Sequence, residues 1–182
     1  IVDVSKGPRS ILKQLLRSGP GWQNPVDGFG VDVRLIGRLA PCVDGPYGEM
    51  TCGPVGEVFD ERYAKTPLQW TIGAGSTEIL RGLEMAIETM REGEKAEITL
   101  HPRVAYGAQG DEALGVPPNC YLKYQVHIVK VYEVCYLAFG RIVKKTLTLP
   151  EMVGVPEGDS EVTIKWQGKL LPSEKVFRPT VT

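Results

Sequence analysis

The stretch from Arg81 to Pro118 limits the possible folds of this chain more than any other segment. A helix is predicted to begin just after Ser76 or Thr77 and to continue into this stretch. Either of these two residues suits a helix N-cap. The apolar residues of this helix share one face: Ile79, Leu83, Ile87 and Met90. Gly93 stands where the helix is expected to end in a left-handed C-cap. The sequence thus predicts one short, one-sided helix that leads directly into extended structure.

Alternating apolar and polar residues surround this helix and are typical of half-buried strands. The alternation is clearest at Val31–Leu39, which is rich in β-branched residues, and at Tyr121–Tyr132. In the second segment one side is apolar: Leu122, Tyr124, Val126 and Ile128. Further strands are expected at Ile11–Arg17, Glu57–Asp60, Leu68–Ile72 and Lys95–Leu100. Many strands and a single helix predict an α+β fold, in which a twisted antiparallel β-sheet wraps around one short helix.

Residues 40–56 separate two of these strands and are rich in glycine and proline. They predict a long surface loop, and loops of this length are often functional or mobile. Cys42 and Cys52 both lie in it and are able to form a disulfide in an oxidising compartment. We favour the other interpretation, reduced thiols in a cytosolic protein.

The sequence also repeats itself, because residues 11–39 align without a gap with residues 142–170. Identical residues recur, among them Ile11, Lys13, Pro25, Val31, Gly37 and Leu39 as Ile142, Lys144, Pro156, Val162, Gly168 and Leu170. After a shorter loop, residues 57–59 are echoed by residues 175–177. A repeat at a fixed spacing marks an array of like units.

We therefore expect a tail or linker at residues 1–10 and one complete domain at residues 11–134. A linker at 135–141 and the truncated start of a second copy at 142–182 follow. The first residue is Ile, which indicates a piece of a longer, tandem-domain protein.

Charge is nearly balanced, with 21 basic and 22 acidic residues, so no footprint for nucleic acid or an anionic membrane stands out. The longest apolar runs are far too short to span a bilayer. We expect neither nucleic acid nor a membrane as a partner, and a cytoplasmic location.

Hydrolytic, redox and metal chemistry find no support in the sequence. Gly73 and Gly75 open the predicted helix but lack the third glycine of a dinucleotide loop and the lysine of a phosphate loop. The four cysteines form no C-x-x-C pair, and only two histidines are present. We therefore expect no metal site and no cofactor.

The order of helix, charged turn, strand, Ala105-Tyr106-Gly107 corner and Val116-Pro117-Pro118 loop resembles the FKBP-type prolyl isomerases, or immunophilins. The resemblance covers roughly residues 11–134 and implies proline-containing peptides or proteins as clients. Prolyl isomerisation needs no nucleophile or metal, because its barrier of about 18–20 kcal/mol comes from amide resonance. The twisted amide has less charge separation than the planar one, so a dry, apolar pocket favours it.

Carried onto this sequence, the family pattern implies Asp60 and Tyr106 as catalytic residues. In the same pattern, a backbone N–H at Ile79 or Leu80 would donate a hydrogen bond to a substrate carbonyl. The implied substrate-binding walls are Phe59, Trp70, Ile79, Leu80, Leu83, Val116, Tyr124, Leu35 and Leu68.

Three leucines depart from that pattern. Leu35 stands where the family usually has a tyrosine that meets the acid, Leu83 replaces the tryptophan floor, and Leu68 replaces an aromatic wall. Without the tyrosine Asp60 loses an expected hydrogen-bond partner, at a cost of about 1–3 kcal/mol if it is buried. The segment 73–78 is also longer by two residues than the pattern, and the tip at 111–115 is longer and more acidic. These departures predict weakened isomerisation and weak macrolide binding.

Two functions follow. The first is an FKBP-type peptidyl-prolyl cis-trans isomerase of reduced activity in a multi-domain immunophilin or co-chaperone, which Asp60, Tyr106 and Val116 favour. The alternative is a non-catalytic interaction module, in which the groove or residues 40–56 bind partner proteins; the three leucines favour this second function.

Overall fold

The computed structural model describes residues 1–5, 9–21, 23–40, 56–75, 79–137, 142–146, 158–159, 161, 163–164, 166–170 and 175–181. Contacts within the chain divide it into two compact units, Ile1–Thr148 and Leu149–Thr182. The first unit contains the long sheet and the helix.

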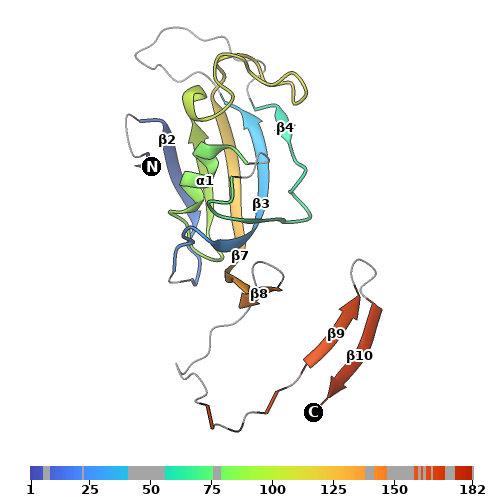
Figure 1. Cartoon of the computed structure of the whole chain (residues 1–182). Helices are drawn as coiled ribbons and strands as arrows, with labels where there is room; N and C mark the ends of the chain where they lie inside the picture. The colour runs from blue at the N-terminus through green and yellow to red at the C-terminus, as the bar shows by residue number, and fades with distance from the viewer. Residues whose placement is uncertain are drawn as a thin grey trace. The chain divides into compact units, whose positions relative to one another are not determined.

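An antiparallel sheet of eight strands forms the first unit, in the order β1-β2-β6-β7-β3-β4, with β5 beside β3 and β8 beside β7 (Figure 1). The strands are β1 (Val2–Asp3), β2 (Ile11–Arg17), β3 (Phe29–Leu39), β4 (Val58–Asp60), β5 (Leu68–Thr71), β6 (Lys95–Leu100), β7 (Leu122–Leu137) and β8 (Ile142–Thr146). One α-helix, α1 (Arg81–Ile87), and a 3-10 turn, η1 (Pro102–Val104), complete it. The α+β prediction is confirmed.

The core lies between α1 and the sheet, where Figure 1 shows the helix crossing in front of the strands. All four apolar residues predicted to share one helix face are buried, from Ile79 to Met90. The alternating side of β7 is buried as well, at Leu122, Tyr124, Val126 and Ile128. Removing these side chains from water is the main force that holds a seven-residue helix, too short to be stable alone, against the sheet.

The bounds of the helix differ from the prediction. It begins at Arg81 with Leu80 as N-cap and no side-chain cap, while residues 76–78 lie outside the described part of the chain. It ends at Ile87, because Met90 N–H donates to the carbonyl of Ile87, which tightens the chain into a turn. Gly93 is left-handed at φ +79°, but it opens the turn into β6 rather than capping the helix.

The two ends of the first unit carry strands where the sequence suggested a tail and a linker. Val2 and Asp3 pair with Lys13 and Leu12. The last strand β7 continues to Leu137 and pairs with β8. Residues 41–55, with Cys42 and Cys52, lie outside the described residues.

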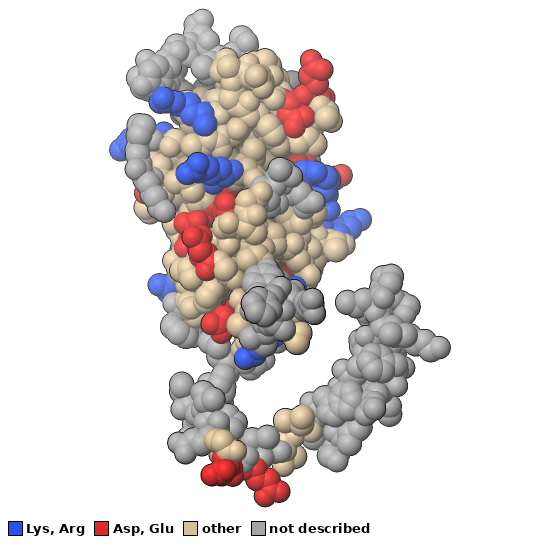
Figure 2. Space-filling model, viewed as in Figure 1, with Lys and Arg blue, Asp and Glu red and all other residues tan. Residues whose placement is uncertain are grey.

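In the second unit, β9 (Trp166–Leu170) pairs antiparallel with β10 (Lys175–Val181). Across the described residues, no helix is long and apolar enough to cross a membrane. On the face of the first unit drawn in Figure 2, basic and acidic side chains are interspersed, as the balanced composition predicts.

Candidate functional site

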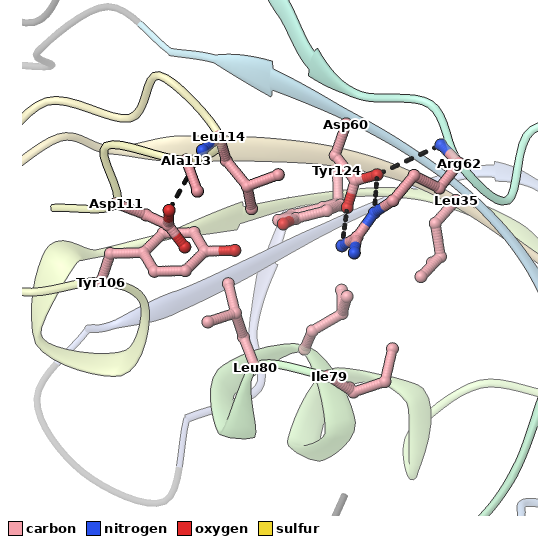
Figure 3. Close-up of a pocket in the computed structure, with 11 residues that line it drawn as sticks. Leu35, Asp60, Arg62, Ile79, Leu80, Tyr106, Asp111, Ala113, Leu114 and Tyr124 are labelled. Atoms are coloured by element: carbon pink, nitrogen blue, oxygen red, sulfur yellow. Dashed lines mark hydrogen bonds and ion pairs between the residues drawn. The ribbon is translucent and has the colours of Figure 1, made fainter. Parts of the chain in front are cut away.

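A cavity of about 340 Å³ opens between the start of α1, the strands β3, β4 and β7, and the loop after η1 (Figure 3). Its lining residues are Leu35, Asp60, Arg62, Ile79, Leu80, Leu83, Tyr106, Asp111, Ala113, Leu114 and Tyr124. Five leucine or isoleucine side chains make most of the wall apolar. The polar groups lie at two places, around Asp60 and around Tyr106.

The aromatic wall depends on a glycine in β3. A Cβ atom on Gly37 would lie 2.7 Å from Cζ of Phe59 and 2.9 Å from Cε1 of Tyr124. Its absence lets the two rings meet edge to face, with centroids 5.6 Å apart. This contact holds the Tyr124 ring, which borders the cavity, in place.

A closed loop positions the opposite wall. The backbones of Asp111 and Val116 exchange two hydrogen bonds, of 2.9 and 2.8 Å. Gly110 precedes them at φ +69°, and a Cβ there would lie 2.4 Å from the Val116 carbonyl oxygen. The chain therefore turns tightly at this point and presents Asp111 and Leu114 to the cavity.

Asp60 is only 6% exposed, and its carboxylate is paired with Arg62. The Arg62 Nε donates to Oδ1 and Nη2 donates to Oδ2, each at a distance of 3.0 Å. The backbone N–H of Arg62 also donates to Oδ1, over 3.2 Å. These bonds raise the pKa of the Arg62 guanidinium above its ordinary value. The acid that lacks a tyrosine at position 35 thus has a cation instead.

The side chains of Tyr106 and Tyr124 both line the cavity, and each affects the pKa of the other. Burial raises the pKa of Tyr106, and the nearby Asp111 carboxylate adds to the effect. Burial also raises the pKa of Tyr124 well above its usual range, with the Tyr106 side chain as the next cause. Both phenols are therefore neutral hydrogen-bond donors at physiological pH.

Seven of the eleven predicted site residues line the cavity together: Leu35, Asp60, Ile79, Leu80, Leu83, Tyr106 and Tyr124. The other four do not line this cavity: Phe59, Leu68, Trp70 and Val116. These four belong to the core beside the cavity, because their side chains pack against neighbouring elements. Phe59 packs edge to face against Tyr124, which lines the cavity. The indole N–H of Trp70 is buried without a partner among the described residues.

Sequence reasoning missed the four other residues of the lining: Arg62, Asp111, Ala113 and Leu114. All four lie in turns, where no periodic pattern reports the direction of a side chain. The acidic tip at residues 111–115 was the one available signal. In the part of the chain that the structure describes, no three His, Cys, Asp or Glu side chains gather as a metal site.

Comparisons with known proteins agree with this geometry. The family model for "FKBP-type peptidyl-prolyl cis-trans isomerase" matches residues 21–129. FK506-binding protein 1B of Aspergillus fumigatus is 34% identical over 121 residues, which are 66% of this chain and 93% of that protein. Peptidyl-prolyl cis-trans isomerase FKBP4 of Bos taurus is 33% identical over 119 residues. That match covers 65% of this chain, which therefore spans only about a fifth of the bovine protein, 22%.

Among solved structures, the three FKBP domains of wheat FKBP73 are similar, with a TM-score of 0.65 and 29% identity. The similarity covers 93% of this chain and 64% of the wheat chain. A peptidyl-prolyl cis-trans isomerase from Pseudomonas syringae has a TM-score of 0.50 and 26% identity, over 66% of this chain and 74% of that one. The chain belongs to the family of FKBP-type peptidyl-prolyl cis-trans isomerases, and its relatives include multi-domain immunophilins.

Proposed function

We propose that the cavity binds a proline residue of a peptide or protein and accelerates the cis-trans isomerisation of its preceding peptide bond. The observation that carries this proposal is the convergence of Asp60, Tyr106 and Tyr124 with a mostly aliphatic wall around one space. A cavity of about 340 Å³ falls at the lower end of the usual range for ligand sites.

The apolar wall would act on the amide itself. Twisting the peptide bond removes its resonance and reduces its charge separation, so a water-poor, apolar surface stabilises the twisted state more than the planar one. Leu35, Leu80 and Leu83 supply that surface.

Two donors would hold the carbonyls that flank the proline. The neutral Tyr106 hydroxyl lies at the cavity and is one donor available to a substrate carbonyl. The backbone N–H of Leu80 has no acceptor within the described ranges of the chain, and it lies at the cavity wall. Each such bond is worth about 0.5–1.5 kcal/mol, and 1.36 kcal/mol is a tenfold change in rate.

We further propose that the activity is lower than in family members with an aromatic floor. Leu83 offers a smaller, aliphatic surface in place of an indole. Both oxygens of Asp60 already accept hydrogen bonds from Arg62, so the carboxylate interacts less with a substrate. Two relatives, from Aspergillus fumigatus and Drosophila melanogaster, are named FK506-binding proteins. By the same reasoning, this cavity binds a macrolide of that kind weakly.

The test is the refolding of a protein whose slow phase is limited by a proline, with the whole chain added as catalyst. We expect the rate constant to rise in proportion to the concentration of the chain. Tyr106→Phe removes one hydrogen bond and should lower the catalysed rate roughly 2- to 13-fold. The matched control is Tyr121→Phe, on a half-buried tyrosine outside the cavity, which should keep the rate. A rate equal to that in buffer at high concentration of the chain would eliminate catalysis.

We also propose that residues 142–182 begin a second copy of the domain. Strand pairing supports it: Gly37 and Arg38 of β3 oppose Asp60 and Val58 of β4, with a bulge between the pairs. In β9 and β10, Gly168 and Lys169 oppose Arg178 and Val176, again with a shift between the pairs. These are the positions that the repeat aligns.

In this alignment, Arg178 stands where the first copy has Asp60. The second copy therefore lacks the acid that the family pattern assigns to catalysis, and we assign the proposed activity to the first copy.

The second candidate function is a non-catalytic binding module. The Asp60–Arg62 ion pair favours it, because a neutralised acid and an aliphatic floor still accept a peptide without promoting rotation. In that case the chain would bind proline peptides and leave the slow refolding phase unchanged.

A further inference from the structure

We propose that Asp111 makes the cavity select prolines that stand next to a lysine or arginine. This specificity rests on the proposed binding of proline peptides and names the class of peptide that the site prefers.

The charges of the lining lead to this conclusion. Three of its side chains carry a formal charge at neutral pH: Asp60, Arg62 and Asp111. Asp60 and Arg62 cancel each other through two parallel hydrogen bonds of 3.0 Å. Asp111 forms no ion pair with a lysine or arginine of the described residues. One uncompensated negative charge therefore faces a ligand, and it lies on the side of the cavity away from Arg62 (Figure 3).

The Asp111 carboxylate is also held in place before any ligand arrives. Its Oδ1 accepts a hydrogen bond from the backbone N–H of Leu114, over 3.1 Å. Its own backbone is fixed by the two hydrogen bonds to Val116. The close-up shows the carboxylate beside the Tyr106 ring, and its charge contributes to the raised pKa of that tyrosine. A fixed, partly buried charge loses little conformational freedom when it binds a cation.

The neighbouring wall suits the rest of a basic side chain. Leu80 and Leu114 border the cavity on the Asp111 side. Lysine and arginine bury their methylene stems along such apolar surfaces and keep the charged head at a polar group. A glutamate at the same place in the peptide would put two carboxylates close together, which is unfavourable.

The experiment compares three peptides that differ only in the residue beside the proline, which is lysine, alanine or glutamate, placed once before and once after it. Affinity is measured by titration of the whole chain, at about 20 mM and about 300 mM salt. We expect lysine to bind roughly three- to tenfold more tightly than glutamate in at least one of the two positions, and salt to reduce the difference.

Asp111→Asn keeps the acceptor for Leu114 and removes the charge, so it should abolish the discrimination. Glu112→Gln is the matched control, since Glu112 is the adjacent acid, is exposed, and does not line the cavity. Equal affinity for the three peptides in wild-type chain overturns the role of Asp111 and leaves the proposed function intact. Equal loss of discrimination in both variants overturns it too, because it would show a general surface field. If no peptide binds, the proposed function fails.

Discussion

At the scale of single residues, Asp60 is paired with Arg62 and not with the tyrosine that the family pattern led us to expect. A carboxylate that is 6% exposed needs a partner, and Leu35 has no polar group to offer. Arg62 fills this need from the turn after β4, only two residues along the chain. Its side chain is 51% exposed, so the pair is part surface and part interior.

Arg62→Ala should therefore lower the free energy of unfolding by about 1–3 kcal/mol, because it leaves a buried carboxylate with fewer hydrogen bonds. Urea denaturation of the whole chain, followed by circular dichroism, measures the change. Arg81→Ala serves as control, since Arg81 is exposed at the start of α1 and should cost less than about 0.5 kcal/mol. Equal effects of the two substitutions would show that Asp60 does not depend on Arg62.

The raised pKa values of Tyr106 and Tyr124 give a second prediction at this scale. A raised pKa keeps a phenol neutral to a higher pH than in water, so both donors persist throughout the neutral range. The catalysed part of the refolding rate should be flat between about pH 6 and pH 9, with the uncatalysed rate subtracted at each pH. A fall by half or more before about pH 9 would contradict the role of neutral tyrosine hydroxyls.

At the scale of elements, the cavity is built where three of them converge: the β3–β4–β7 part of the sheet, the start of α1, and the loop after η1. Regular elements were predictable from sequence, since Ile11–Arg17 and Lys95–Leu100 were expected with the bounds that the structure has. The helix start was not, because Leu80 caps α1 without a side-chain hydrogen bond and leaves no residue-type signal.

The same contrast between regular elements and irregular segments explains which residues of the cavity lining could be predicted. Leu35, Leu83 and Tyr124 lie on regular elements, and the family pattern that pointed to them named residues that line the cavity. Arg62 and Asp111 lie in turns whose backbone sets the direction of the side chain, so no spacing could identify them.

Gly37→Ala tests the aromatic wall at this scale. The added methyl group meets Phe59 and Tyr124, which should cost about 1–3 kcal/mol of stability and weaken peptide binding at the cavity. Gly30→Ala is the matched control on the same strand, where the methyl group would meet Tyr132, which does not line the cavity. Calorimetry should show both variants destabilised, and titration with a proline peptide only the first one weakened. Equal affinities in the two variants would separate the Phe59–Tyr124 contact from the function.

At the scale of the whole molecule, all residues that line the cavity belong to the first compact unit, Ile1–Thr148. The second unit, Leu149–Thr182, has its own strand pair. We therefore assign the proposed activity to the first unit.

Removal of residues 149–182 should then leave the catalysed refolding rate unchanged and shift the Tm of the first unit by less than about 2 °C, a change of under 1 kcal/mol. Thermal unfolding and the refolding assay on the shortened chain measure both quantities. A large loss of either would show that the second unit supports the cavity.

The central claim, that this cavity receives a proline ring, is tested most directly by the methyl NMR signals of the leucines during titration with a proline peptide. Leu35, Leu80, Leu83 and Leu114 line the cavity, whereas Leu15 and Leu16 are exposed on β2. We predict that the first four signals shift together and saturate at one dissociation constant, while the other two stay in place. Signals that remain still in the cavity while the peptide binds elsewhere, or that never move at all, would contradict the claim.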